Sequence, residues 1–504
     1  MKLRTGWLVV FFVMLLSFVL VSTFAYPQQK QQKPVKAQTM MSKDEIPVTT
    51  KSQEARDKYL EGLRYMGNIQ VDKAGASFQD AIKADPDFAL AYWGLAQTRV
   101  KYSDAKQDFE KAESLMGKVS EGEKQLITFA KSQFEGNNAK AKEALDKLLS
   151  MFPRDKRVQQ YAGNYEFAVN RNYDAAIQHM QKAINIDKNY APAYNMLGYA
   201  YSFKNDFKKA EAAFKKYISL VPDNPNPYDS YAELLLKNGR YDESIKQYQK
   251  ALSIDPNFWS SYEGMGNNYL FKNNFSKARE NYQQLYDKSP LSNWKLASLY
   301  DQAVSFVREG DITNALAALD KQASLAESEG TAAVLVNNHN NQGFILVENG
   351  KPEEAIKHFD MAKEKIDASG LADQLKKNLT ARVNLFRSYG LIAQGKLDEA
   401  KSDLENKDKL IGGSTDPGIG KQYETIMGYL AFKQNKYDEA LAHFQKADDQ
   451  SPMVWYYMSQ VYAKKGDTGK AAKLVDRIKK SNLNSLELAV AHNNTRATVA
   501  KETK

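Results

Sequence analysis

The histidines are the residues of this sequence whose type most directly allows chemistry, because an imidazole can bind a metal ion or transfer a proton near neutral pH. Five are present: His179, His339, His358, His443 and His492. No two of them form a pair such as H-E-x-x-H, the spacing that puts two metal ligands on one face of a helix. The chain also has no cysteine, which excludes thiolate ligands and disulfides. We predict no metal site and no cofactor.

A glycine-rich stretch, residues 412–420 with the sequence GGSTDPGIG, is the next candidate, because such loops can cradle a phosphate. A phosphate-binding loop requires G-x-x-x-x-G-K followed by Ser or Thr. Here Gln422 follows Gly420 and Lys421, and Thr415 occupies the position of the first glycine. The stretch therefore predicts a connecting loop. No serine-nucleophile, kinase or dinucleotide motif occurs elsewhere, so we expect no enzyme activity.

Polar and aromatic side chains also recur at positions that could recognise a peptide. Each set has the spacing i, i+4, i+7, which is one stripe of a helix. Three sets lie 34 residues apart: Asn195, Tyr199 and Ser202; Asp229, Glu233 and Leu236; and Glu263, Asn267 and Leu270. The same register upstream gives Tyr59, Leu63 and Met66; Trp93, Gln97 and Val100; and Tyr161, Tyr165 and Ala168. Aromatic rings supply buried area and amides can hydrogen-bond an extended backbone, so these residues are candidates for binding a protein segment. The alternative is that they pack against the neighbouring unit or face water.

A longer-range period shows which elements carry these residues. Pro222, Pro256 and Pro290 lie 34 residues apart, and a fixed period of this size is typical of stacked repeats. Within one period, two apolar stripes of helical spacing flank a polar turn at residues 204–206. They are Tyr194, Leu197, Gly198 and Tyr201, then Ala210, Phe214 and Tyr217. The unit is therefore a helical hairpin, and only stacking on the next hairpin can bury its apolar face.

These units resemble the tetratricopeptide repeat. The family pattern is an aromatic residue, Leu-Gly, Tyr, then Ala-x-x-x-Phe and a closing Pro. It matches Tyr194, Leu197, Gly198, Tyr201, Ala210, Phe214 and Pro222. The resemblance implies an all-α fold, a right-handed superhelix of α-α hairpins, with the polar and aromatic sets on its concave surface, where partner peptides bind. One subclass of the family clamps a carboxylate there with Lys, Asn and Arg, and Asp229, Glu233 and Glu263 depart from that subclass.

The repeat register divides the chain. A regular array of about seven units is expected over 53–290, and an irregular array of about five units over 291–484, where the spacing of the second helices loosens. Residues 485–504 read as a capping helix followed by a polar tail. Terminal units of such arrays need an outer face that tolerates water.

The amino-terminal residues predict export. Lys2 and Arg4 precede an apolar run from Trp7, and small residues lead to Ala25, which describes a secretory signal over 1–25. The run of 7–25 also approaches the length of a membrane span, so an uncleaved inner-membrane anchor is the other interpretation. Residues 26–52 are rich in Gln, Lys and Pro and predict a disordered linker. We expect a periplasmic or otherwise extracytoplasmic protein.

The net charge of +9 raises the question of a nucleic-acid partner. Lys and Arg alternate with acids, as in the sequence KKAE at 208–211, which is typical of solvated helix faces. We therefore expect no nucleic acid. The acidic residues Asp229, Glu233 and Glu263 would repel an anion, so the expected ligand is a neutral or basic, partly apolar protein segment.

Two functions of different classes remain open from the sequence. The first is an exported, non-enzymatic scaffold that binds a protein segment and supports assembly of a cell-envelope complex. The second is a sensory or regulatory module that works with a membrane signalling kinase or transporter. An enzyme with a site between repeats has no motif in its favour.

Overall fold

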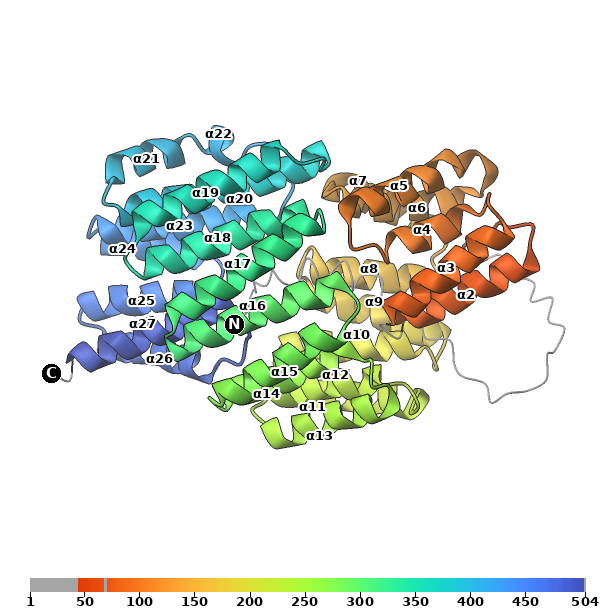
Figure 1. Cartoon of the computed structure of the whole chain (residues 1–504), viewed down its shortest axis with the longest axis horizontal. Coiled ribbons are helices and arrows are strands. Elements are labelled where there is room, and N and C mark those ends of the chain that lie inside the picture. The colour runs from red at the N-terminus through yellow and green to blue at the C-terminus, as the bar shows by residue number, and fades with distance from the viewer. Residues whose placement is uncertain (1–43, 68–69, 503–504) are drawn as a thin grey trace. The chain divides into compact units, whose positions relative to one another are not determined.

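The computed structural model describes residues 44–67 and 70–502, and 78% of these described residues lie in helices. No strand occurs within those residues. The helices follow one another as antiparallel pairs (Figure 1). The prediction of an all-α stack of helical hairpins is confirmed. The signal over 1–25 and most of the linker over 26–52 lie outside the described residues.

Seven hairpins run from Gln53 to Lys288. Their helices are α2 (Gln53–Gly67) with α3 (Val71–Ala84), α4 (Ala89–Ala96) with α5 (Tyr102–Ser114), α6 (Glu121–Phe134) with α7 (Asn138–Met151), α8 (Lys156–Ala168) with α9 (Tyr173–Ile186), α10 (Ala191–Phe203) with α11 (Phe207–Leu220), α12 (Asn226–Lys237) with α13 (Tyr241–Ile254), and α14 (Trp259–Phe271) with α15 (Phe275–Lys288). A short 3-10 turn, Met116–Lys118, links the second hairpin to the third.

Five longer or less regular hairpins follow. Their helices are α16 (Ser292–Glu309) with α17 (Ile312–Ser328), α18 (Ala332–Glu348) with α19 (Pro352–Asp367), α20 (Asp373–Ala393) with α21 (Leu397–Glu405) and the short α22 (Lys407–Ile411), α23 (Ile419–Lys433) with α24 (Tyr437–Lys446), and α25 (Pro452–Lys464) with α26 (Thr468–Lys480). The last helix is α27 (Leu486–Glu502). The glycine-rich stretch 412–420 connects α22 to α23.

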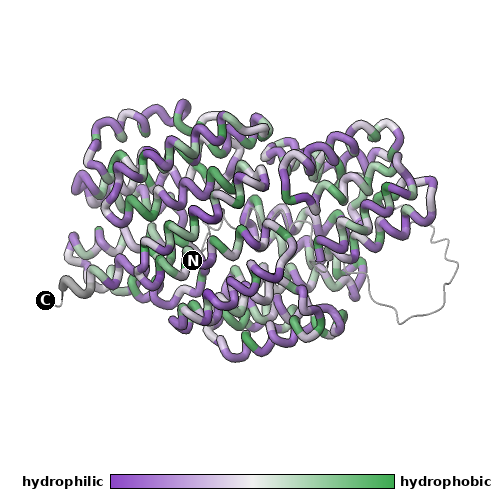
Figure 2. Tube along the Cα trace, in the orientation of Figure 1, coloured by the Kyte–Doolittle hydropathy of each residue, from purple (hydrophilic) through white to green (hydrophobic). Residues whose placement is uncertain are grey.

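Several hairpins close through a glycine on the first helix and an aromatic ring on the second. The Phe214 ring of α11 lies directly over Gly198 of α10, where a Cβ atom would come within 2.5 Å of it. Figure 2 shows hydrophobic and hydrophilic residues mixed along the helices. The tetratricopeptide pattern thus reflects a close helix crossing, which a larger residue at Gly198 would force apart.

The chain divides into two compact units, with the boundary inside α14, between Met265 and Gly266. In the unit that ends at Met265, the stack curves back on itself. Lys73 on α3 pairs with Asp255, at the end of α13, at 3.3 Å, and Gln70 also donates to Asp255. Successive first helices contact one another, as α8 does with α10 and α10 with α12, more than successive second helices do. The first helices therefore line the inner side of the curve.

In the unit from Gly266 onward, the last helix does more than cap the array. A cap would contact the final hairpin alone, yet α27 packs against α16 and α18 as well as α25 and α26. The Leu486 amide donates to the Tyr300 hydroxyl at 3.3 Å, and Asn484 donates to Asp301 at 2.9 Å. The chain end thus returns to the first complete hairpin of its unit.

The residues just ahead of α2 also differ from the sequence expectation. Residues 46–50 are extended and lie against the first four hairpins, with Ile46 and Val48 buried. The disordered linker expected through residue 52 therefore does not include them. The hydrogen bonds that hold this segment have no periodic signature, which is why repeat register does not reveal it.

A membrane-spanning segment was one expectation for residues 7–25, which are outside the described part of the chain. Among the helices of the described residues, none is both long enough and apolar enough to cross a bilayer.

Candidate functional site

The aromatic residues proposed for the amino-terminal part of the groove are core residues. The Tyr59 ring lies 5.9 Å from the Phe78 ring of its own hairpin and 5.0 Å from the Phe88 ring of the next. Trp93 on α4 is buried in the same cluster. Both rings pack inside the protein, so they hold neighbouring hairpins together and do not face solvent.

Tyr161 and Tyr165 on α8 are buried in the same way. Both rings lie 6.2 Å from the Phe129 ring of α6, and the Tyr165 hydroxyl donates to the Asn138 carbonyl at 3.0 Å. Burial raises the pKa of both phenols, to about 12 for Tyr165. These two rings therefore pack on the preceding hairpin. This is the alternative to peptide binding that the sequence left open.

The remaining predicted residues divide between core and surface. Leu236 and Leu270 are buried. Asn195 on α10 is also buried, and its side-chain oxygen has no hydrogen-bond partner among the residues that the structure describes. Asn267 on α14 is half-buried and accepts hydrogen bonds from the Tyr282 hydroxyl and the Asn484 amide, both at 2.7 Å. Asn267 is thus already engaged by its own unit.

Four predicted residues come together, and we call them the acidic cluster: Tyr199, Asp229, Glu233 and Glu263. They lie on α10, α12 and α14, three consecutive first helices, which the 34-residue register places on one stripe. Tyr199 is half-buried, and its hydroxyl donates to Ser230 at 3.1 Å. Asp229 is 3% exposed, Glu263 is half-buried, and Glu233 is exposed. The cluster is therefore open to solvent at Glu233 and closed at Asp229.

Sequence reasoning missed the serines that hold Asp229. Ser261 and Ser260, in the first turn of α14, donate to Asp229 Oδ1 at 2.6 and 3.1 Å. Nothing in the repeat pattern marks these serines, since hydroxyl residues are common at the start of a helix. They fix one oxygen of Asp229 but bring no positive charge to it.

The electrostatics of the cluster follow from that missing charge. Burial raises the pKa of Asp229 to about 6. Desolvation and then the negative charge of Asp229 raise the pKa of Glu263 to about 7. The same two causes raise the pKa of Glu233 to about 8, although water reaches this side chain and screens part of the effect. Within the described residues, none of the three acids pairs with a Lys or Arg.

One basic group lies on the same helix as Glu233, without pairing with it. Lys237 of α12 donates to the Ser202 carbonyl at 2.8 Å, and its ammonium lies 4.4 Å from the centre of the Phe203 ring. Burial lowers the pKa of Lys237 to about 8. This lysine therefore stabilises the α10–α12 contact.

Four of the five histidines contact neighbouring side chains. His179 contacts the Gln159 side chain at 2.9 Å, His443 contacts Glu424 at 2.8 Å, and the His339 and His358 rings approach at 3.4 Å. Burial lowers the pKa of His179, His339 and His358, which favours the neutral imidazole. In residues 44–67 and 70–502, no group of three His, Cys, Asp or Glu side chains could hold a metal ion.

Four profiles of one family match the chain. Two described as a TPR repeat and a tetratricopeptide repeat match residues 232–272 and 191–224, and two further tetratricopeptide repeat profiles match 431–491 and 134–192. The matches fall in both the regular and the irregular array. The resemblance seen in the sequence is confirmed.

Several curated proteins are similar to parts of the chain. Anaphase-promoting complex subunit 3 of Schizosaccharomyces pombe is 26% identical over 39% of this chain and 28% of its own length. Tetratricopeptide repeat protein 13 of Homo sapiens is 29% identical over 29% of this chain and 17% of its own length. The DnaJ protein P58IPK homolog of Arabidopsis thaliana is 25% identical over 38% of this chain and 45% of its own length. The chain spans less than half the length of each.

Solved structures show the same kind of partial likeness. The Cut9–Hcn1 hetero-tetramer structure matches 84% of this chain and 76% of that chain at 14% identity, with a TM-score of 0.38. The type IV pilus biogenesis factor PilW matches 48% of this chain and 97% of that chain at 19% identity, with a TM-score of 0.30.

Proposed function

The chain belongs to the tetratricopeptide repeat family, and on that premise we propose that it is a non-enzymatic scaffold that binds a segment of another protein at the acidic cluster. The observation that carries this proposal is a set of three acids, Asp229, Glu233 and Glu263, that face one another and have no basic partner among residues 44–67 and 70–502. Like charges held together and partly desolvated store unfavourable energy, which a bound cation would relieve.

The chemistry of the cluster favours a basic and partly apolar segment. A Lys or Arg side chain placed between Glu233 and Glu263 would supply the missing charge. The Tyr199 ring beside them, half-buried and 5.3 Å from the Phe214 ring, offers an aromatic face to the aliphatic part of the ligand. An anionic segment is disfavoured there, since the acids would repel it.

The setting of this activity is part of the same proposal. The signal-like residues 1–25 favour an exported protein, either released after Ala25 or held at the inner membrane by 7–25. A segment-binding array in that compartment suits assembly of a cell-envelope complex. Mass determination of the mature amino terminus would distinguish release from anchoring, and a cytoplasmic protein that starts at Met1 would contradict export.

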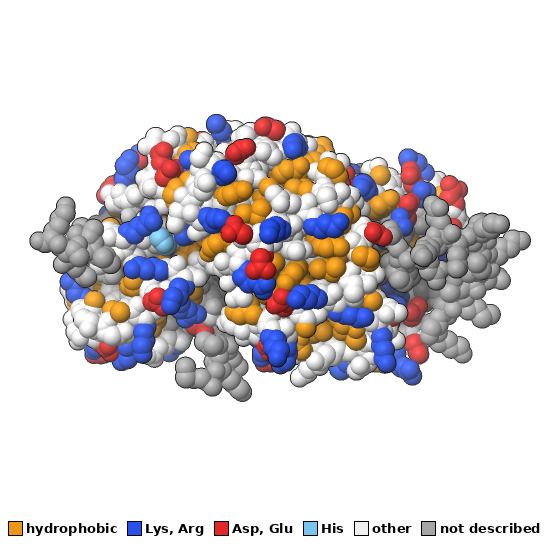
Figure 3. Space-filling model, turned by 90° about the horizontal axis from the view of Figure 1, so that it is seen from below, with side chains coloured by type: hydrophobic (Ala, Val, Ile, Leu, Met, Phe, Trp, Pro, Cys, Tyr) orange, Lys and Arg blue, Asp and Glu red, His pale blue; other side chains and the backbone are white. Residues whose placement is uncertain are grey.

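The charge distribution of the surface agrees with a protein partner. On the face shown in Figure 3, Lys and Arg side chains are interspersed with Asp and Glu. Mixed charge of this kind does not match the continuous basic footprint of nucleic-acid binding. The proposed partner is therefore protein.

Site-specific crosslinking in the full-length chain tests the proposal. A photoreactive amino acid replaces Tyr199 in the cluster or, as a control, Lys246, which is exposed on the second helix α13. We expect crosslinks to a protein segment that contains Lys or Arg from position 199, and none to that segment from position 246. Equal crosslinking from both positions, or a crosslinked segment with net negative charge, would contradict the proposal.

A charge-matched pair of variants tests the same point quantitatively. Asp229→Asn, Glu233→Gln and Glu263→Gln together remove the cluster charge, and we expect them to weaken binding of the crosslinked segment by about tenfold or more. The control combines Glu110→Gln, Glu113→Gln and Glu143→Gln, which neutralise three exposed acids on second helices of the same unit. Its affinity should match that of the unaltered chain. Isothermal titration with the identified segment measures both.

A further inference from the structure

Residues 46–51 form an extended strap that crosses four consecutive hairpins. Ile46 lies at the start of α8, Thr49 at the start of α6, and Thr50 and Lys51 at Asp85, which precedes α4. Arg56 of α2 completes the series by donating to the Val48 carbonyl at 2.8 Å. The strap thus runs opposite to the order of the repeats, over the amino-terminal ends of their first helices.

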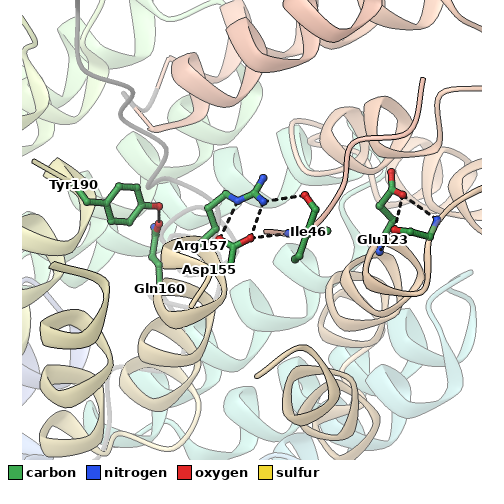
Figure 4. A network of polar contacts seen from close by, with 7 residues as sticks. Ile46, Glu123, Asp155, Arg157, Gln160 and Tyr190 are labelled. Atoms are coloured by element: carbon green, nitrogen blue, oxygen red, sulfur yellow. Dashed lines mark hydrogen bonds and ion pairs between the residues drawn. The ribbon is translucent and has the colours of Figure 1, made fainter. Parts of the chain in front are cut away.

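Side chains of the array hold the strap mainly by its backbone. The Ile46 amide donates to Asp155 Oδ2 at 2.9 Å, and the Ile46 carbonyl accepts from Arg157 at 3.0 Å, so one residue is bound on both sides (Figure 4). The Thr49 amide donates to Glu123 at 2.7 Å and the Lys51 amide to Asp85 at 3.1 Å. Bonds to the backbone recognise an extended peptide whatever its side chains are.

The strap side chains alternate as those of a strand do. Ile46 and Val48 are 1% and 5% exposed and belong to the same apolar cluster as Tyr59 and Phe88, while Pro47 is half-buried and Thr49 is exposed. Successive side chains of an extended chain point to opposite sides, which gives this period of two. The array therefore offers two apolar pockets, separated by one residue, beside a row of backbone-binding groups.

Two of the acids that accept hydrogen bonds from the strap, Asp155 and Glu123, are fully buried. Arg157 bonds to Asp155 at 2.6 Å, and Ser120 donates to Glu123 as part of its helix cap, but each acid also takes hydrogen bonds from the strap. Figure 4 shows Asp155 bonded to Ile46 of the strap, and Glu123 on a different hairpin. Without the strap, Glu123 Oε1 would lose the Thr49 amide and Asp155 Oδ2 would keep Arg157 but lose the Ile46 amide, which costs free energy unless another donor replaces them.

We propose that these groups form a peptide-binding site that the chain fills with its own residues 46–51, and that the site accepts, in trans, an extended segment with apolar side chains at two alternate positions. The strap joins α2 through a single residue, Ser52, and no other helix of the described chain continues from it. It can therefore leave the site without the unfolding of a hairpin. This site shares no residue with the acidic cluster, so either can fail without the other.

The experiment uses the full-length chain with the strap expelled. Ile46→Asp with Val48→Asp places two carboxylates in the apolar pockets next to Glu123 and Asp155, where they cannot remain. A fluorescent peptide with the sequence of residues 44–52, DEIPVTTKS, is titrated into this variant and into the unaltered chain, and anisotropy is measured. We expect saturable binding to the variant at least tenfold tighter than to the unaltered chain, in which the tethered strap competes at a millimolar effective concentration.

Two controls define the binding mode. A peptide carrying the two Asp substitutions should not bind the strap-expelled variant. Adding Arg56→Met to that variant removes the donor to the Val48 carbonyl and should weaken peptide binding several-fold, whereas Lys58→Met on the same helix should leave binding unchanged. Equal binding to the variant and the unaltered chain would overturn the proposal. So would an absence of binding to a variant whose circular dichroism is unaltered.

If the double substitution prevents folding, hydrogen exchange in the unaltered chain tests the proposal instead. In the unaltered chain, the amides of Ile46, Thr49 and Lys51 should exchange at least tenfold faster than the slowest amides of α6 and α8, because the strap opens alone. Exchange of the strap and these helices at one common rate would overturn the proposal, since the strap would then be a fixed part of the core.

Discussion

Asp155 and Asp229 are the same residue type, both almost completely buried in the same unit, and their acidities are shifted in opposite directions. Burial opposes ionisation of Asp155, but the Arg157 ion pair and the hydrogen bonds from Arg157 and the Ile46 amide outweigh it and lower its pKa. Burial raises the pKa of Asp229, and two serine hydroxyls do not offset it. The difference is whether the chain supplies a counter-charge.

The regions around the two acids differ accordingly, because the chain supplies a counter-charge to Asp155 and none is seen at Asp229 in the described residues. Around Asp155, the strap and Arg157 satisfy the acid, and the surface is closed. Around Asp229, the neighbouring groups are two more acids, Glu233 and Glu263, and Glu233 remains exposed. While the strap is in place, the region of Asp155 has its charge paired and gains little from a partner, whereas the acidic cluster gains from any cation that reaches it.

The largest expected effect comes from removing the counter-charge of Asp155. Arg157→Met leaves a buried carboxylate with only part of its partners, and we expect it to lower the free energy of unfolding by about 3–5 kcal/mol. Urea denaturation followed by circular dichroism measures the change. The control, Arg154→Met, removes an exposed cation near the same helix end and should cost less than about 0.5 kcal/mol. Equal effects of the two variants would show that the Asp155 ion pair is not what holds this region.

The second prediction concerns the acidic cluster, where removing charges should raise the stability of the protein and not lower it. Carboxyls whose pKa is raised on folding stabilise the protein below their unfolded values, near 4, and this contribution is lost as pH rises through about 6 to 8. Asp229→Asn with Glu233→Gln and Glu263→Gln should therefore increase stability relative to the unaltered chain by roughly 1–3 kcal/mol at pH 9, and far less at pH 5. Melting temperatures across this pH range would reveal the trend, and a difference independent of pH would refute it.

The strap region should show the opposite pH dependence, with a smaller effect. The pKa values of Asp155 and Asp85 are lowered on folding, so their contribution is present above the ordinary value of 3.8 and disappears as pH falls below it. We expect protection of the Ile46 and Lys51 amides to be constant from pH 7 to about 5 and to fall below pH 4, after correction for intrinsic exchange. Protection that declines already between pH 7 and 5 would be inconsistent with acids of lowered pKa.

The smallest effect concerns one hydroxyl. Ser261→Ala removes the 2.6 Å hydrogen bond to Asp229, which favours the ionised acid, so the pKa of Asp229 should rise further. We expect a rise of about one unit or less, equivalent to about 1 kcal/mol. Carbon-13 NMR of the Asp229 carboxyl measures it. Ser253→Ala, an exposed serine that bonds only within its own helix, should leave the titration unaltered.

At each end of the described chain, a segment outside the hairpin series packs on the hairpins. The strap closes the start of one unit, and α27 covers α16, α18 and α25 of the other, with Leu488 and Ala491 fully buried. In each unit a segment outside the hairpin series covers surface that the hairpins alone would leave open. Stacked repeats expose apolar and polar surface at their ends and inner sides, and a chain can cover it with its own residues.

Much of the fold could be predicted from the sequence because the contacts that define a hairpin are local and periodic. Gly198 and Phe214 meet across one turn, and the same pair recurs as Gly428 with Phe444 far along the chain. The residues predicted to line a groove were harder to assign from the sequence, since one stripe of a helix contains both core and surface positions. Tyr59 and Tyr165 proved to be core, while Tyr199, Asp229, Glu233 and Glu263 came together.

The sequence by itself determined that helical hairpins form and stack, because apolar spacing of 3.6 residues and a period of 34 require each unit to bury its face on the next. Only the tertiary structure decided which acids have partners. Ile46 reaches Asp155 across more than a hundred residues, and Ser261 reaches Asp229 from the next hairpin. Such pairings depend on where the stack brings a side chain in space, and a single sequence carries no periodic signal of them.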